Sequence, residues 1–365
     1  MSRAPVVIAH RGASGHRPEH GAAAYRLAIA QGADAIEPDI VASRDGVLVL
    51  RHENEISGTT DVADHAEFAD RRTSKEIDGT VLTGWFTEDF TWSELSTLRI
   101  RERLPRLRPR SAAHDGEGRI LRLVDLLSLL DSDEARHRTA QPTTGRPGAG
   151  VGLVAEVKHA TYFDSIGLPL DELVAAELTA LGWAQDARLT IESFERAVLG
   201  AIRARGVAGR SVYLMEAEGA PFDLVARDGS AARTFADQLE PDSLAALAVG
   251  EGGVHLDGIS VDKSLLIDDD GIPQPAVVER AHGVGLDVFT WTLRPENAFL
   301  PRALRRGAGE ARFGDWEVEL ARIVGTGIDG VFADYPDLAL RAIEAGGSTS
   351  EGGGIARGRD VGGRA

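Results

Sequence analysis

Short apolar runs rich in β-branched residues alternate along the chain with alanine- and leucine-rich segments that are typical of helices. We expect strands at 5–10, 34–41, 47–52, 151–157, 188–192, 211–215, 256–261, 286–292 and 328–333. We expect helices at 21–31, 122–131, 171–182, 194–205, 275–284 and 335–344. Strands separated by helices indicate βαβ units and a parallel sheet. The pattern therefore predicts an α/β protein with a (β/α)8 TIM barrel, in which one of the nine candidate strands lies outside the barrel.

Two segments interrupt this alternation. Residues 57–118 are too long and too rich in apolar and aromatic positions to be an ordinary connection, so we expect a small inserted subdomain there. Residues 346–365 are rich in glycine and have no apolar face, which predicts a disordered tail. The expected organisation is a barrel over 1–345, carrying the insertion within it, followed by this tail.

Composition narrows the class of protein. The chain has 365 residues, of which 43% are hydrophobic and 27% charged, so it can bury a large core. The absence of cysteine excludes disulfides, zinc–thiolate sites and cysteine nucleophiles. A net charge of −17 argues against nucleic-acid partners, although a locally positive site can still bind a small anion.

The amino-terminal segment does not resemble a signal peptide, and no apolar stretch approaches the length of a membrane span. We therefore expect a cytoplasmic protein, or a secreted or periplasmic one if a signal peptide has been removed. The sequence predicts no particular oligomeric state.

Acidic residues occupy alternate positions in two expected strands. Glu37 and Asp39 share one face of the second strand, and Glu156 and Lys158 share one face of the fourth. Buried carboxylates need a partner, and carboxylate oxygens without cysteine suit a hard divalent cation, Ca²⁺ or Mg²⁺. The alternative is an ion-pair network of these acids with Arg11, Arg51 and Lys158.

Histidines end two of the expected strands. His10 ends the first and His52 ends the third, and barrel enzymes carry their chemistry at the carboxyl ends of strands. Two histidines at this rim can act as a general base and a general acid. Arg11 follows His10 directly and can bind a phosphate through two parallel hydrogen bonds.

An ordered series of motifs resembles the glycerophosphodiester phosphodiesterases, in particular the larger subgroup with a small inserted subdomain. The resemblance covers about residues 5 to 340. The motifs are HRGASGHRPEHG, IEPDIVASRDGVLVLRHENEISGTTDVA, FADRR…IDGTVLTGWFTEDFT, AEVKHATYF, ESFE, VFTWTLRPEN and GIDGVFADYPD. His-Arg-Gly alone is weak evidence, but the whole series in the family's order is specific.

The resemblance implies roles for five residues of the reaction centre. His10 and His52 match the family's two catalytic histidines. Glu37, Asp39 and Glu156 match the ligands of one divalent cation.

It implies roles for five further residues near the substrate. Arg11 and Lys158 match the residues that hold the phosphate. Trp291 matches an aromatic wall, Phe194 matches a residue that shapes the pocket, and Glu19 matches a glutamate of the site region.

The family's reaction converts a glycerophosphodiester, a small-molecule substrate, into glycerol 3-phosphate and an alcohol. We expect the glycerol 2-hydroxyl to attack phosphorus, with His10 as base, His52 as acid and a cyclic phosphate as intermediate. Two alternatives remain open. The substrate can be a lysophospholipid cleaved as by a phospholipase D, or the protein can be an inactive binder of polyol phosphates.

The chain departs from the family pattern at three positions. Gly21 replaces a threonine whose hydroxyl could cap the helix that follows. Glu192 stands where glutamine is common, and Ala333 where threonine is common. These changes put substrate preference and fine geometry in question, because none of them removes a residue assigned to the reaction centre.

Several other polar residues are expected to have no role in the site. We expect His16 and His20 to face solvent and His159 to pack on the far side of its strand. The basic stretch 99–110 is interpreted as a solvated face of the insertion.

Overall fold

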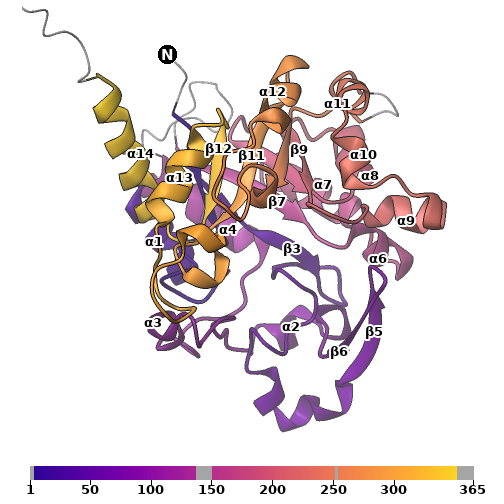
Figure 1. Cartoon of the computed structure of the whole chain (residues 1–365). Coiled ribbons are helices and arrows are strands. Elements are labelled where there is room, and N and C mark those ends of the chain that lie inside the picture. Colours follow the sequence, from indigo (N-terminus) through magenta and orange to yellow (C-terminus); the bar gives the residue numbers. More distant parts are fainter. Residues whose placement is uncertain (1–3, 137–149, 251–253, 352–365) are drawn as a thin grey trace, which may run out of the picture.

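The computed structural model describes residues 4–136, 150–250 and 254–351. Within them the predicted TIM barrel is confirmed, because parallel strands close a ring with β1 paired to both β12 and β2. Figure 1 shows helices packed around this ring. The barrel strands are β1 (Val6–His10), β2 (Ala35–Glu37) with β3 (Asp39–Ala42), β7 (Gly152–Val157), β8 (Leu189–Ser193), β9 (Arg210–Met215), β10 (Gly258–Asp262), β11 (Asp287–Leu293) and β12 (Gly330–Ala333).

β2 and β3 form one barrel strand that is interrupted at Pro38. Both pair with β7, Ala35 opposite Gly152 and Asp39 opposite Glu156. Proline has no N–H to donate, but its carbonyl accepts a hydrogen bond from the backbone of Glu156. This register places the Asp39 and Glu156 side chains next to each other at the end of the barrel.

The candidate strand outside the barrel is β4 (Leu48–Leu50), which forms an antiparallel hairpin with β3. His52 therefore does not end a barrel strand, contrary to expectation. Leu50 lies opposite Ile40, and the backbone N–H of Arg51 donates to the carbonyl of Asp39 at 3.1 Å. The hairpin thus reverses the chain and returns His52 to the carboxyl end of β2 and β3.

Each predicted helix is present, and others appear where the sequence gave no clear periodicity. The α-helices of the barrel and its loops are α1 (Ala22–Gln31), α4 (Leu123–Leu130), α5 (Asp133–Arg136), α6 (Ala160–Ser165), α7 (Leu170–Ala180), α8 (Arg196–Ala204), α9 (Phe222–Asp228), α10 (Phe235–Gln238), α11 (Pro241–Ala248), α12 (Ala276–Gly283), α13 (Trp316–Val324) and α14 (Pro336–Glu351). Short 3₁₀ turns lie at Gly229–Ala231, Lys263–Leu265, Asn297–Phe299 and Arg302–Leu304. None of the described helices combines the length and the apolar character needed to cross a bilayer.

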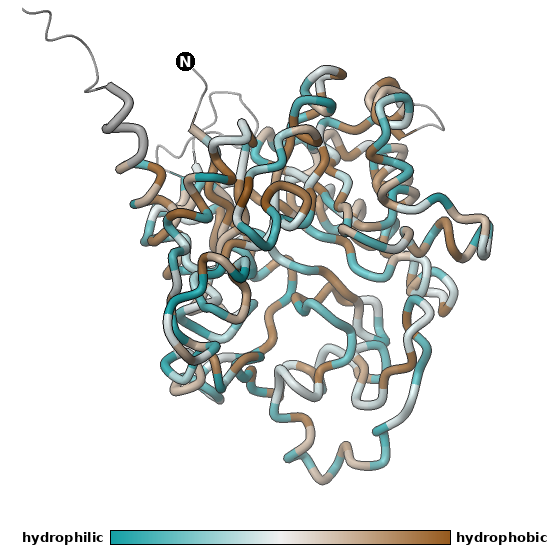
Figure 2. Tube along the Cα trace, viewed as in Figure 1, coloured by the Kyte–Doolittle hydropathy of each residue, from teal (hydrophilic) through white to brown (hydrophobic). Residues whose placement is uncertain are grey.

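Side-chain alternation divides each strand between two apolar cores. In β1, Val7 and Ala9 face the surrounding helices and belong to the large outer core. Val6 and Ile8 point into the barrel and pack there with Phe289, Phe332 and other apolar residues. His10 shares the face of Val6 and Ile8, so it stands above this inner core at the barrel mouth. Figure 2 shows the hydrophobic residues concentrated along the strands and hydrophilic ones on the outer loops.

The segment 57–118 lies at the end of the barrel where the strands have their carboxyl ends, below the barrel in Figure 1. It contains η1 (Val62–Asp64), η2 (Ala66–Arg71), the hairpin β5 (Thr73–Ile77) and β6 (Thr80–Gly84), η3 (Thr87–Asp89), α2 (Trp92–Leu95) and α3 (Pro109–Ala112). Trp85, Phe86 and Phe90 are buried, and the Trp85 indole donates to the carbonyl of Phe68 at 2.6 Å. Phe68, Trp85 and Phe90 belong to the same apolar cluster as the barrel's outer core, so the segment packs continuously onto the barrel.

The disordered tail was expected from residue 346, which is earlier than the structure supports. Helix α14 continues to Glu351, through residues 346–351 that we expected to be disordered. No proline stops the helix there, and extending an existing helix gains one hydrogen bond for each residue that is fixed, against about 1 kcal/mol for a glycine. Residues 352–365 lie outside the described part of the chain.

Candidate active site

Three carboxylates from adjacent strands converge at the barrel mouth. One side-chain oxygen from each of Glu37, Asp39 and Glu156 lies within 4.8 Å of the other two, and all three residues are buried. Strand register explains this, because Asp39 pairs with Glu156 across β3 and β7 and Glu37 precedes Asp39 by one alternation. The acids predicted from spacing therefore form one cluster.

The cluster carries more negative charge than its neighbours balance. Burial raises the pKa of Glu156 to about 8, with the charge of Asp39 adding to the effect. Burial and Asp39 also raise the pKa of Glu37 well above its usual range. Oε1 of Glu37 and Oδ1 of Asp39 are buried without a hydrogen-bond partner in the structure. These orphaned hard oxygens fit a divalent cation.

The alternative, an ion-pair network, is realised only in part. Lys158 Nζ lies 2.8 Å from Glu156 and 3.6 Å from Asp39, and Arg11 Nε lies 3.3 Å from Asp39. These cations hold the pKa of Asp39 well below its usual range, although burial acts in the opposite direction. Arg51 does not join them, because its guanidinium donates to the backbone carbonyls of Leu50, Thr59 and Glu19.

His10 is held by a buried aspartate that sequence reasoning missed. His10 Nδ1 lies 2.6 Å from Oδ1 of Asp334, the residue that directly follows β12. Arg108 and Arg294 donate to the other oxygen of Asp334 at 2.6 and 2.8 Å. Burial and the charge of Arg11 lower the pKa of His10 to about 4, so the ring is neutral at pH 7. The strand-end rule, applied to β12, would have found Asp334.

His52 has a similar partner. Its Nδ1 lies 2.5 Å from Oε1 of Glu53, and Arg103 binds both oxygens of Glu53 at 2.9 and 2.7 Å. Burial lowers the pKa of His52 to about 3, and the charges of Arg11 and Lys158 contribute. Each histidine therefore presents Nε2 to the site while a carboxylate holds Nδ1.

Arg11 is placed by a sharp turn at the end of β1. Its φ is 60° and that of Gly12 is 86°, which turns the chain out of the strand. The Arg11 backbone N–H donates to Glu37 Oε2 at 2.7 Å, and its guanidinium donates to Glu19 at 3.0 Å. Glu19 is buried, so it supports Arg11 rather than facing the cavity.

The predicted aromatic residues form one wall beside Lys158. The Lys158 ammonium lies 5.5 Å from the centroid of the Phe194 ring, and Phe194 meets Trp291 edge-on at 5.6 Å. Phe235, from α10, packs on the other side of Phe194.

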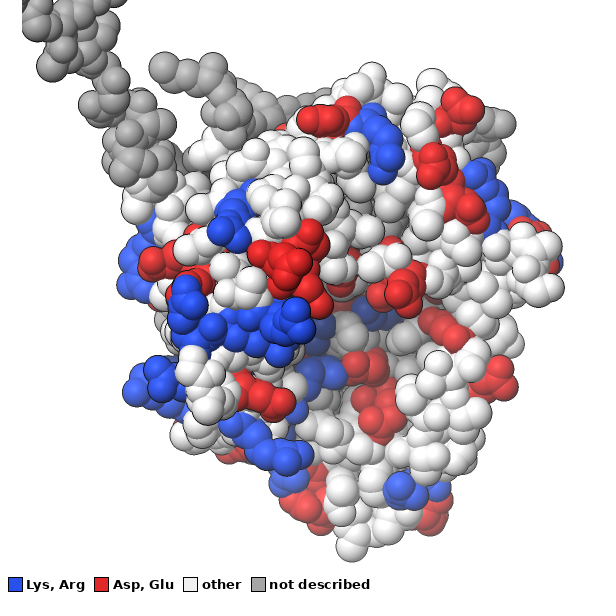
Figure 3. Space-filling view, in the orientation of Figure 1, with Lys and Arg blue, Asp and Glu red and all other residues white. Residues whose placement is uncertain are grey.

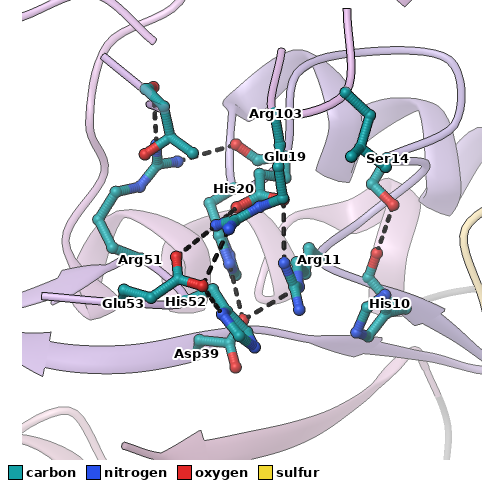
Figure 4. Close-up of polar contacts among 12 residues, drawn as sticks. His10, Arg11, Ser14, Glu19, His20, Asp39, Arg51, His52, Glu53 and Arg103 are labelled. Atoms are coloured by element: carbon teal, nitrogen blue, oxygen red, sulfur yellow. Dashed lines mark hydrogen bonds and ion pairs between the residues drawn. The ribbon is translucent and has the colours of Figure 1, made fainter. Parts of the chain in front are cut away.

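Two histidines that we expected to lie away from the site are part of it. His20 is fully buried, with Nε2 at 2.9 Å from Asp39 Oδ2 and Nδ1 at 2.8 Å from the Tyr25 hydroxyl. It orients Asp39 and does not face solvent (Figure 4). His159 adopts φ 52° and turns to the cavity, where its Nδ1 lies 2.6 Å from Asp78 of the β5–β6 turn.

The interpretation of 99–110 as a solvated face is wrong at two positions. Arg103 reaches Glu19 and Glu53, and Arg108 is buried against Asp334 and Glu296. A stretch of basic residues suggests a solvent-exposed surface when its partners are unknown. Here, acids far away in the sequence neutralise these two arginines.

A cavity of about 600 Å³ opens above the acid cluster. Its lining includes both histidines, Arg11, Lys158, Glu37 and Glu156 on one side, and on the other the aromatic wall, the loop before α9 and the β5–β6 turn. Figure 3 shows this face hollowed between barrel and insertion, with basic side chains on one side of the hollow and acidic ones on the other. Glu192 also lines it, and burial together with Glu156 raises its pKa well above the usual range.

Comparisons with known proteins identify the family of the chain. The profile of the glycerophosphoryl diester phosphodiesterase family matches residues 10–338. A glycerophosphodiester phosphodiesterase of Arabidopsis thaliana, GDPD6, is 29% identical over 346 residues, covering 91% of this chain and 84% of the relative. A second Arabidopsis thaliana phosphodiesterase, GDPDL6, is 26% identical over 93% of this chain, which spans only 40% of that relative.

Solved structures share the fold. A putative glycerophosphoryl diester phosphodiesterase from Silicibacter pomeroyi has a TM-score of 0.62 at 22% identity, covering 94% of both chains. A phosphodiesterase from Oleispira antarctica, solved with the product sn-glycerol-3-phosphate, has a TM-score of 0.55 at 21% identity, covering 93% of this chain and 97% of the other.

Proposed function

Because the chain belongs to the glycerophosphoryl diester phosphodiesterase family, we propose that it hydrolyses a glycerophosphodiester to glycerol 3-phosphate and an alcohol, with the help of one divalent cation. The observation that carries the proposal is the convergence of three buried carboxylates with His10 and His52 around one cavity. The reaction class is inferred from the family, and the roles of individual residues are inferred from the geometry of the site.

Glu37, Asp39 and Glu156 are the proposed ligands of Ca²⁺ or Mg²⁺. Their oxygens are hard ligands, and two of them are buried without a partner in the described structure. A bound cation would neutralise charge on the phosphate as the transition state becomes more negative. Arg11 and Lys158 line the same cavity and add fixed positive charge for the phosphate oxygens.

His10 is the proposed base of the first step. Asp334 is held ionised by Arg294 and Arg108, although burial opposes this, so it accepts a hydrogen bond from Nδ1–H of His10. The lone pair of the neutral ring then lies on Nε2. In this mechanism, Nε2 of His10 removes the proton of the substrate's 2-hydroxyl while the 2-oxygen forms its bond to phosphorus.

His52 is the proposed acid of the same step. The bond from phosphorus to the alcohol oxygen breaks, and Nε2 of His52 gives this oxygen its proton. Burial lowers the pKa of His52, and the positive charges of Arg11 and Lys158 lower it further. The acid role therefore requires that a bound phosphodiester anion raise this pKa by opposing those charges. A cyclic phosphate remains.

Water opens the cyclic phosphate with the histidine roles reversed. His52 takes a proton from the water as the water oxygen bonds to phosphorus, the bond from phosphorus to the 2-oxygen breaks, and His10 returns the first proton to that 2-oxygen. The product is glycerol 3-phosphate, and both histidines regain their starting protonation states.

A lysophospholipid is the second candidate substrate, because one side of the cavity is apolar. Phe222 and Val225 of α9 and Phe235 of α10 line it beyond Phe194. These side chains could contact an acyl chain, whereas the glycerophosphodiester needs only the polar side.

The test is hydrolysis of glycerophosphocholine by the purified protein, followed as release of glycerol 3-phosphate and choline. We expect turnover that EDTA abolishes and that Ca²⁺ or Mg²⁺ restores. An analogue without the 2-hydroxyl should not react, and normal turnover of that analogue would disprove internal attack. Preference for lysophosphatidylcholine would support the second candidate, and binding of glycerol 3-phosphate without any turnover would identify an inactive binding protein.

A further inference from the structure

We propose that Arg103 and Arg108 of the insertion are positioning residues, each of which holds one catalytic histidine through an intervening carboxylate. This inference rests on the proposed function, because it assigns how His52 and His10 are kept ready for their different roles. It gives the insertion a part in the reaction through two residues that reach the histidines only by way of carboxylates.

Arg103 binds two carboxylates at once. Its Nη1 and Nη2 donate to the two oxygens of Glu53 at 2.9 and 2.7 Å, and Glu53 in turn holds Nδ1 of His52 at 2.5 Å. Its Nε and Nη2 also donate to Glu19 at 2.8 and 2.6 Å, and Glu19 holds Arg11. Figure 4 shows Arg103 between these two carboxylates, above Asp39 and His52.

Arg108 repeats this arrangement for the other histidine. Its Nη2 donates to Asp334 Oδ2 at 2.6 Å, and the second oxygen of Asp334 holds Nδ1 of His10 at 2.6 Å. Its Nε donates to Glu296 at 2.8 Å, and the guanidinium lies 5.5 Å from the centroid of the Tyr335 ring. The Arg108 side chain is only 4% exposed, so its charge depends on these partners.

The shared design explains what the arginines contribute. A carboxylate that binds Nδ1–H fixes both the tautomer and the orientation of an imidazole, and loss of such a supporting partner typically costs 10- to 100-fold in activity. An arginine on the far side of the carboxylate fixes the carboxylate itself and keeps it ionised. Both arginines come from one short segment, so the insertion aligns the two histidines together.

The same segment provides matched controls. Arg106 and Arg110 are exposed arginines on either side of Arg108. Replacing either one with alanine removes one positive charge, as Arg103→Ala and Arg108→Ala do. It leaves the arginines that hold Glu53 and Asp334 in place. We expect Arg106→Ala and Arg110→Ala to keep wild-type activity.

The first measurement is steady-state hydrolysis of glycerophosphocholine by the metal-loaded full chain, with melting temperatures recorded for every variant. We expect Arg108→Ala to lower kcat about 10- to 100-fold with little change in KM. We expect Arg103→Ala to lower kcat similarly and also to raise KM, because Glu19 and Arg11 lose their support. Lysine at either position restores part of the loss, since it keeps the charge but not the two-pronged geometry.

The second measurement separates the two arginines by leaving group. p-Nitrophenol leaves without protonation, so the p-nitrophenyl ester of glycerol 3-phosphate makes little demand on the acid, His52. Because His52 is also the base of the second step, the rate compared is that of alcohol release in a single turnover. The loss for Arg103→Ala should shrink at least about tenfold on this ester, whereas that for Arg108→Ala, which acts through the base His10, should persist. A purely structural defect would lower the rates on both substrates by the same factor in both variants.

The carboxylate variants guard against unfolding. If an arginine variant melts too early to assay, Glu53→Gln and Asp334→Asn interrupt the same two chains without removing a buried guanidinium, and they should give the same leaving-group pattern. Wild-type-like kcat for Arg103→Ala and Arg108→Ala, or a loss for Arg103→Ala that is as large on the p-nitrophenyl ester as on glycerophosphocholine, would overturn the inference while the wild type remains active. A wild type that cleaves neither ester would instead overturn the proposed function.

Discussion

Gly21 and Ile100 lie in direct contact: a Cβ on Gly21 would lie 2.5 Å from Cδ1 of Ile100. Gly21 is the N-cap of α1 and makes no side-chain capping bond there. The departure from the family's threonine therefore coincides with the insertion, whose Ile100 occupies the space of that side chain. Ile100 of the insertion thus occupies the space that a capping side chain at this position would need.

We predict that Gly21→Ser destabilises the protein by about 1–3 kcal/mol, because an added side chain overpacks a buried contact. In an Ile100→Ala background, where that space is vacated, the same Gly21→Ser change should cost much less. Chemical denaturation measures both. Gly58→Ser is the control, because nothing lies within 4 Å of a Cβ at Gly58. Equal effects at both glycines would refute the overpacking argument.

We predict that His10→Ala and His52→Ala each lower the rate of glycerophosphodiester hydrolysis about 10²- to 10⁴-fold, the usual contribution of a general acid or base. Initial rates at saturating substrate measure the loss. His16→Ala is a matched control in the same loop as His10, because His16 is partly exposed and pairs with Asp337. A small effect at either His10 or His52 would remove that residue from the mechanism.

We predict that Ca²⁺ or Mg²⁺ stabilises the wild type and raises its melting temperature. At a free metal concentration of 100 Kd, the free energy of unfolding should increase by about 2.7 kcal/mol. Glu156→Gln should abolish the increase, because it removes one of the three converging ligands. Differential scanning fluorimetry of EDTA-treated protein measures it without any substrate. Glu117→Gln, at an exposed position, should respond as the wild type does. A full metal response in Glu156→Gln would exclude this site.

We predict that the metal-free protein loses stability as pH rises from 6.5 to 8. Glu156 has its pKa raised from 4.5 to about 8, so in this window the folded state binds more protons than the unfolded state, and the free energy of unfolding falls. His10, with its pKa lowered from 6.5 to about 4, has the opposite effect but only below 6.5. Thermal unfolding in EDTA measures the slope, which bound metal should flatten. A rising slope would contradict the assignment.

We predict that Glu192→Gln stabilises the metal-free protein at pH 8 by about 1 kcal/mol or more. Burial and Glu156 raise the pKa of Glu192, so ionising it in the folded state has a cost that the uncharged amide avoids. The gain should shrink as pH falls towards 4.5, where the carboxyl is protonated in the folded state and about half protonated in the unfolded state. Denaturant titrations at both pH values measure it, and a pH-independent gain would point to packing instead.

The barrel was predictable because its strands are short apolar runs, buried on both faces, that alternate with helical segments. Which of the nine candidate strands lies outside the barrel could not be predicted, because the antiparallel hairpin strand β4 has the same local pattern as a parallel barrel strand. Only the pairing partner distinguishes the two. His52 was nevertheless assigned to the mouth, because the hairpin returns it there by a route that local sequence does not show.

The acid cluster and both histidines were predictable since each lies on or beside a strand with readable alternation. Asp334, Arg103 and Arg108 were not assigned, because their meaning depends on contacts between segments far apart in the chain. His20 was misread because a loop rich in glycine and proline suggests solvent, whereas the insertion covers this loop. Periodicity describes a segment's own environment and not its distant partner.

The β5–β6 turn forms part of the cavity wall, and its Asp78 touches the barrel through His159. Thr73 and Gly84 pair at the base of this hairpin, so its two ends leave the rest of the insertion side by side. A loop of different length can therefore be grafted between them without moving a barrel strand. The hairpin is a natural place for evolution, or an engineer, to exchange the alcohol that the enzyme accepts while the machinery for breaking the ester bond stays unchanged.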